Sequence, residues 1–130
     1  MPQLTIESSN RMETIDITDD VAAAIPESVT DGICSVYVTH TTAAVTVNEN
    51  ESGLRTDTES FLHDLVPSAG HKHDTIDNNA DSHLRATLIG PDVTVPVRDG
   101  SLALGTWGSI LFFDFDGPRR RTIEVTVVEK

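Results

Sequence analysis

The second half of the chain consists of short runs of strand-forming residues separated by tight-turn signals, and this pattern restricts the fold more than any other feature. The runs cover residues 93–97, 101–104, 106–115 and 122–129, and the turns include Asp99–Gly100 and Asp116–Gly117. Aspartate–glycine pairs suit such turns because both residues tolerate positive φ. We therefore expect a largely antiparallel sheet.

The first half adds strands and the helices. Residues 3–7 and 12–18 alternate apolar and polar side chains and predict an opening hairpin that turns at 8–10. A β-branched run at 33–40 predicts a strand, and we expect 43–48 to pair near it. Thr18 predicts the hydroxyl cap of a short helix, and apolar spacing predicts helices at 53–66 and 80–89. Together these elements predict an α+β fold, a sheet or sandwich with two or three short helices.

Length and charge limit the kind of protein. The 130 residues fit one domain, residues 1–130, and the net charge of -12 disfavours nucleic acid, which is bound through Lys and Arg. High Asp and low Lys predict adaptation to a high-salt cytoplasm, where ions screen the self-repulsion. No run approaches the roughly 20 apolar residues that cross a bilayer, so we expect a soluble, cytoplasmic protein. Cys34, the single cysteine, is expected to be a buried, inert thiol.

A polar segment from His71 to His83 is rich in metal-coordinating side chains. It carries three histidines with Asp77 among other carboxylates, and His40 lies far upstream at the end of a predicted strand. We expect His71 and His73 to lie on one side of an extended loop. Three histidines from separate elements, plus a water, would form a catalytic zinc-type site with an open position. Solvated loop histidines are the alternative.

Two further features are typical of ligand sites. The run Arg119–Arg121 is the only cationic cluster, and guanidinium groups match phosphate oxygens, so a phosphorylated ligand is one reading and charge compensation the other. Trp107, the only tryptophan, lies between two glycines and is expected either to stack on an aromatic ligand or to pack in a core or interface.

Taken in order, these residues resemble the YjbQ-like family over nearly the whole chain. The matching elements are His40-Thr-Thr-Ala-Ala44, Val47-Asn-Glu-Asn50, Asp57, His73-Asp74, Asn79-Ala-Asp-Ser-His83, Gly90, Val95-Pro96, the run from Gly100 to Trp107, and Asp116-Gly-Pro-Arg-Arg-Arg121. Two positions depart from the family pattern, since Gly108 stands where glutamine is common and Thr42 where serine is common.

The resemblance implies a homotrimer with a site near the subunit boundary and the activity of a secondary thiamine-phosphate synthase. That enzyme joins an aminopyrimidine methyl diphosphate to a thiazole phosphate. The implied residues follow in one list: His40, His73 and His83 as metal ligands and catalytic groups, Glu49 and Asp77 as further catalytic groups, and Asn79, Trp107, Arg119 and Arg121 as substrate ligands. His71 is not carried over.

The chemistry of the ligand set leaves more than one function open. Three histidines suit Zn²⁺ or a similar transition ion better than Mg²⁺, which prefers oxygen ligands. The first alternative is a metal-dependent hydrolase of a small phosphorylated or cyclic compound, with metal-bound water as the nucleophile. The second is a trimeric protein that binds a metal or an anion and catalyses nothing.

Overall fold

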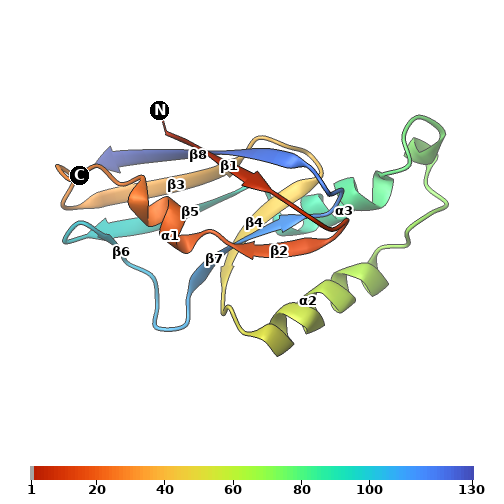
Figure 1. Cartoon of the computed structure of the whole chain (residues 1–130), viewed down its shortest axis with the longest axis horizontal. Helices are drawn as coiled ribbons and strands as arrows, with labels where there is room; N and C mark the ends of the chain where they lie inside the picture. The colour runs from red at the N-terminus through yellow and green to blue at the C-terminus, as the bar shows by residue number, and fades with distance from the viewer. Residues whose placement is uncertain (1) are drawn as a thin grey trace.

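The computed structural model describes residues 2–130, and its strands form two antiparallel sheets with helices beside the smaller one (Figure 1). The five-stranded sheet has the order β1 (Gln3–Glu7), β8 (Arg120–Glu129), β3 (Gly32–Val38), β5 (Asp92–Arg98) and β6 (Ser101–Leu102). The three-stranded sheet has the order β2 (Glu13–Asp16), β7 (Ser109–Asp114) and β4 (Ala43–Asn48). The predicted α+β class is confirmed.

Over the described range the remaining elements are three α-helices and one 3-10 turn: α1 (Thr18–Ala23), α2 (Ser52–Leu65), η1 (Lys72–Thr75) and α3 (Ala80–Ile89). The predicted helices at 53–66 and 80–89 are thus confirmed to within a residue. The extended loop expected around His71 and His73 is wrong, because this segment closes into η1. Among residues 2–130 no helix has the length and apolar character needed to span a bilayer.

Alternating side chains build the main core between the two sheets. Val36 of β3 and Val125 of β8 face Val45 of β4 and Phe112 of β7, and each is at most 1% exposed. The opposite face of the three-stranded sheet packs a second cluster against α2 and α3, in which Phe113 lies with Leu62 and Ala86. Because β7 is covered on both faces, it is a continuous apolar run rather than an alternating one.

Two predicted strand pairings are wrong, because consecutive strands change sheets. Strand β1 pairs with β8 while β2 pairs with β7, so residues 3–16 form no hairpin. Strand β4 likewise pairs with β7 rather than with β3. Hydrogen bonds run from the Ser8 amide to the Arg119 carbonyl and from the Gly117 amide to the Arg11 carbonyl, so the β1–β2 corner follows the β7–β8 corner. A Cβ on Gly117 would collide with the Asn10 carbonyl.

Of two local predictions, the tight turn at Asp99–Gly100 is confirmed and the helix cap at Thr18 is wrong. Asp99 and Gly100 have φ values of 51° and 78°, which confirms the positive-φ turn expected between β5 and β6. The Thr18 hydroxyl does not cap α1, whose N-cap residue is Ile17. It donates instead to Asp16 Oδ1 at 2.6 Å and accepts from the Ile110 amide at 2.9 Å. The hydroxyl therefore ties α1 to β7.

Candidate functional site

A cleft of about 620 Å³ lies at one end of the molecule, where three connections meet. The segment after β3 supplies His40, the start of α3 supplies His83, and the β7–β8 corner supplies the arginines (Figure 1). The lining residues are Thr39, His40, Thr41, Thr42, Asp77, Asn79, His83, Asp116, Arg119, Arg120 and Arg121. Six of the nine predicted site residues therefore border one cavity.

A backbone contact selects one neutral tautomer of His40. The Thr122 amide donates to its Nε2 at 2.8 Å, so the neutral ring carries its proton on Nδ1. Burial lowers the pKa of His40, and the positive charges of Arg121 and Arg119 lower it further against the opposing charge of Asp114. The residue thus enters the cleft as a neutral ring with an N–H to donate.

His73 and His83 form a pair beside the cleft. Their ring centroids are 5.0 Å apart with an interplanar angle of 84°. His73 Nε2 lies 3.1 Å from Asn79 Oδ1, whereas the His83 ring has no hydrogen-bond partner among residues 2–130. His83 also borders a second cavity of about 570 Å³ with His73 and His71, and His71 turns away to the Pro67 carbonyl at 2.6 Å.

The arrangement within one chain does not fit a three-histidine metal centre. Over residues 2–130, no three His, Cys, Asp or Glu side chains are grouped so as to hold an ion. Nε2 of His40 already accepts the Thr122 amide and its Nδ1 carries the proton, so neither nitrogen offers a lone pair to a metal. His73 fits better, because an imidazole that donates through one nitrogen presents the other as a ligand.

The three arginines at the cleft differ in burial and in the number of hydrogen bonds that they make within the fold. The Arg121 side chain is 4% exposed and donates to both oxygens of Asp114, at 2.9 and 2.7 Å, and to Thr42 Oγ1 at 2.9 Å. By contrast, the Arg119 side chain is 54% exposed and within residues 2–130 bonds only Asp116, and Arg120 is 75% exposed and pairs with Glu7. Arg119 and Arg120 are therefore the accessible cations of the cleft.

Glu49 and Trp107 lie at the other end of the three-stranded sheet. Glu49 follows β4 whereas His40 precedes it, and six residues of strand separate them by roughly 20 Å. Trp107 precedes β7 whereas Asp116 follows it, and the β6–β7 loop projects away from the α3 end (Figure 1). Glu49 borders a separate pocket of about 120 Å³ with Arg55 and Leu54, and Trp107 is 72% exposed. Neither reaches the histidines within one chain.

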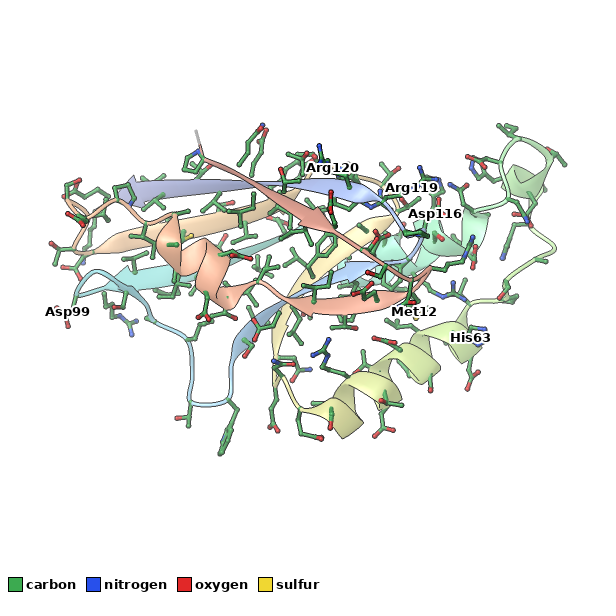
Figure 2. All side chains as sticks on the ribbon, viewed as in Figure 1. Met12, His63, Asp99, Asp116, Arg119 and Arg120 are labelled. Carbon is green, nitrogen blue, oxygen red and sulfur yellow. The ribbon has the colours of Figure 1, made fainter. Side chains whose placement is uncertain are left out.

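Two aspartates and one arginine of the site were missed by reading the sequence. Asp114 is fully buried and Asp116 is 9% exposed, whereas the sequence pattern predicts only a strand end and a turn at these positions. Arg120 borders the cleft, and Figure 2 shows Asp116 and Arg119 side by side at the β7–β8 corner. The available signal was two carboxylates inside an apolar run immediately before three arginines, since buried charges need partners.

Fold and site together define a small α+β sandwich with a cationic, histidine-bearing cleft in an acidic chain. The family model described as UPF0047 protein YjbQ-like matches residues 2–130. The chain therefore belongs to the YjbQ-like UPF0047 family. The predicted family membership is confirmed.

Relatives support the assignment over nearly the full length. A UPF0047 protein of Archaeoglobus fulgidus is 51% identical over 124 residues, which cover 95% of this chain and 97% of that protein. YugU of Bacillus subtilis is 35% identical, with 96% of each chain covered. A hypothetical protein of Aeropyrum pernix K1 has a TM-score of 0.95 at 39% identity, covering 99% and 98% of the two chains. A YbjQ-like protein of unknown function from Sulfolobus solfataricus P2 has a TM-score of 0.95 at 38% identity, covering 99% and 96%.

Proposed function

We propose that this protein is an enzyme that binds a small phosphorylated substrate in the cleft between His40, His83 and the β7–β8 corner. The observation that carries the proposal is the local charge. In a chain of net charge -12 with nine Lys and Arg, three arginines border this one cleft. Asp77 and Asp116 also line the cleft, but Asp116 is 9% exposed and is paired with Arg119 and Arg11. The exposed guanidinium groups of Arg119 and Arg120 are therefore the groups that would attract an anion.

The reaction we propose is the one that the family resemblance implies, the synthesis of thiamine phosphate. The thiazole nitrogen attacks the methylene carbon of the aminopyrimidine, a C–N bond forms, and the C–O bond to the diphosphate breaks. Pyrophosphate then leaves with the bonding electrons. Arg119 and Arg120 would hold the departing oxygens, and the Nδ1–H of His40 would donate to another of them. Such donors stabilise charge where it develops.

Pyrophosphate binding measured by titration calorimetry tests the site. A hydrogen bond to a charged group is worth about 1.5–3 kcal/mol, so Arg119→Ala and Arg120→Ala should each weaken binding roughly 10- to 150-fold. Arg98→Ala is the matched control, because this arginine is exposed in β5 and does not border the cleft. Absence of binding to the unmodified chain, or equal losses in all three variants, would refute the proposed site.

Product formation tests the reaction separately. The two precursors are incubated with the protein, with and without added Mg²⁺ or Zn²⁺, and thiamine phosphate and pyrophosphate are quantified. Formation of both in equal amounts, reduced in Arg119→Ala, supports the synthase. Pyrophosphate binding without product in either metal would exclude the synthase and leave an anion-binding protein.

We also propose self-association as a homotrimer, with the cleft near the subunit boundary. Leu84 and Leu88, one turn apart on α3, are 43% and 56% exposed, and Tyr37 is 46% exposed. Leu84 borders the cavity beside His73 and His83, and Tyr37 borders a groove with His40. Light scattering of the unmodified chain and of Leu88→Glu tests this. A trimer that Leu88→Glu dissociates supports it, and a monomeric unmodified chain contradicts it.

In such a trimer the Glu49 and Trp107 end of one copy is the part that would reach the cleft of another, because neither reaches the cleft of its own chain. When inactive Trp107→Ala and Arg119→Ala chains are mixed and exchange subunits, some clefts would then contain both Trp107 from one copy and Arg119 from another, and activity should return. A mixture no more active than either variant alone would place Trp107 outside the site. A cytoplasmic location stays a prediction.

A further inference from the structure

Asn79 is a helix-capping residue whose side chain does not cap its helix. It occupies the N-cap position of α3, where asparagine ordinarily accepts a backbone N–H of the first turn, but its side chain makes no such bond. Its amide instead bridges two side chains. Nδ2 donates to Asp116 Oδ2 at 3.1 Å, and Oδ1 lies 3.1 Å from His73 Nε2. Asn79 is 8% exposed and Asp116 9%, so the Asn79–Asp116 half of the bridge is buried, while the His73 half is partly buried.

The chemistry of Asp116 determines which way the amide of Asn79 points. Arg119 Nη2 lies 3.2 Å from Asp116 Oδ2, and Arg11 Nη1 lies 3.4 Å from Oδ1. A carboxylate held by two guanidinium groups only accepts hydrogen bonds, so the NH₂ group of Asn79 must face it. The carbonyl oxygen of Asn79 then faces His73 and only accepts. His73 Nε2 must therefore carry a proton, and its Nδ1 keeps the lone pair.

We propose that Asp116 is a positioning residue for His73 and acts on it through Asn79. Asp116 does not touch His73. It orients the amide, and the amide fixes both the tautomer and the tilt of the imidazole, so that Nδ1 is the basic nitrogen of a ring whose centroid lies 5.0 Å from that of His83. Orientation of a working histidine by a second group that is itself hydrogen-bonded is a common arrangement in catalytic and metal sites. What His73 acts upon rests on the function proposed above, but its tautomer does not.

The proposal also gives Asp116 a double role. Its Oδ2 receives both the Asn79 amide at 3.1 Å and the Arg119 guanidinium at 3.2 Å. Arg119 is one of the two accessible cations of the cleft. The guanidinium that would bind phosphate and the amide that fixes the tautomer of His73 therefore share Asp116 Oδ2 as acceptor. The backbone amide of Asp116 donates to Asp114 Oδ1 at 2.9 Å, which ties the backbone of residue 116 to the buried strand end.

The tautomer of His73 is measurable by long-range nitrogen–proton NMR of the ¹⁵N-labelled full chain, treated with EDTA at a pH of about 8, above the ordinary histidine pKa. The expected result for the unmodified chain is a single Nε2–H form with a slowly exchanging ring proton. Asn79→Ala and Asp116→Ala should both lose the slow ring proton and show shifts averaged between the two tautomers. Asn78→Ala is the matched control and should keep the signal, because the Asn78 side chain is exposed and makes no hydrogen bond within residues 2–130.

The effect of Asp116→Ala is the decisive one, since residue 116 acts at a distance. An unchanged His73 signal in a folded Asp116→Ala chain would overturn the proposal, as would an Nδ1–H form in the unmodified chain. If Asp116→Ala does not fold, an unchanged His73 signal in Asn79→Ala would overturn the proposal instead, and this variant is expected to fold because the Asn79 side chain contributes no helix cap. Pyrophosphate titration of the same samples separates the two ideas. If the unmodified chain binds pyrophosphate but the His73 tautomer is the same in all variants, only the positioning role is refuted. If the unmodified chain shows the Nε2–H form but does not bind pyrophosphate, only the proposed function is refuted.

Discussion

Replacing Arg121 by leucine tests whether this guanidinium belongs to the fold or to the substrate site. Its three hydrogen bonds to Asp114 and Thr42 lie between 2.7 and 2.9 Å. The two charged side chains are 4% and 0% exposed. The substitution therefore leaves a buried carboxylate without its cation, and we expect a large loss of stability.

The size of the loss follows from what Asp114 retains. Removing one partner of a buried ion pair costs about 3–5 kcal/mol. Asp114 still accepts from the Ser8 hydroxyl at 2.6 Å and from the Asp116 amide at 2.9 Å, so we expect the lower half, about 3–4 kcal/mol. With a urea slope of about 1–3 kcal/mol/M, the midpoint falls by about 2 M. Far-UV circular dichroism is the suitable probe, because the only tryptophan is 72% exposed and its emission would change little.

The pH dependence gives an independent check. Burial alone would raise the pKa of Asp114, but the hydrogen bonds from Arg121, Ser8 and the Asp116 amide, with the charge of Arg121, outweigh it and lower the pKa. A lowered pKa in the folded state contributes stability above the unfolded value of about 3.9, and this stability is lost as the pH falls through the folded value. Without Arg121 the pKa of Asp114 rises, so the deficit of the variant should shrink on acidification.

Control variants make the result interpretable. Arg98→Leu removes an exposed arginine and should change stability by less than about 0.5 kcal/mol. The double variant Arg121→Leu/Asp114→Leu removes both charges and should recover much of the loss, since apolar replacement of a buried pair is often neutral. A deficit below about 1 kcal/mol for Arg121→Leu at fixed protein concentration, or one that does not vary with pH, would refute the structural role. Arg121 would then be free to serve as the predicted ligand.

Three shorter predictions concern the cleft and the surface. NMR titration should give His40 a pKa below the ordinary value of about 6.5, as burial and the neighbouring arginines require, and a value above it would contradict the Thr122 contact. The melting temperature should rise from low salt to molar KCl, because salt screens the net charge of -12, and a flat or falling curve excludes salt adaptation. Elemental analysis of protein purified without added metal should find a transition ion if His73 and His83 recruit a third ligand from another copy. The His40→Ala variant should keep that ion if His40 acts only as a hydrogen-bond donor. Loss of the ion in this variant would show that His40 is a metal ligand.

Local elements were predictable because local chemistry decides them. The strands at β4 and β5, the helix α3 and the positive-φ turn at Asp99 and Gly100 follow from residue type and spacing within a few positions. Sheet membership was not predictable in this way. The alternation of apolar and polar residues in β1 and β2 predicts which side chains face the core. Because both sheets face the same core, this pattern does not predict which sheet a strand joins. The pairing is fixed by contacts between Ser8 and Arg119, which lie 111 residues apart.

The same limit applies to the site. The histidines were identified from type and spacing, and the fold brings His40 and His83 to one cleft. Family resemblance also pointed to Glu49 and Trp107, but the separation between them and the histidines depends on the direction in which β4 and β7 run. The excess of aspartate predicts salt adaptation but does not reveal which carboxylates are buried, and Asp81 and Asp114 are 3% and 0% exposed.

These buried acids connect the elements beside the cleft. Arg85, only 2% exposed, bonds Asp81 at 2.6 Å and caps the C-terminal carbonyls of α2 through Leu62 and Val66. Asp81 also pairs with Arg11, which reaches Asp116. Ion pairs thus join α3 to both corners, and the Arg85 bonds to backbone carbonyls join α3 to the end of α2. Exposed guanidiniums ordinarily lose conformational entropy when they bind a ligand. Arg119 is already hydrogen-bonded to Asp116, which belongs to this ion-pair network. Part of the conformational entropy of the Arg119 side chain is therefore lost before an anion binds.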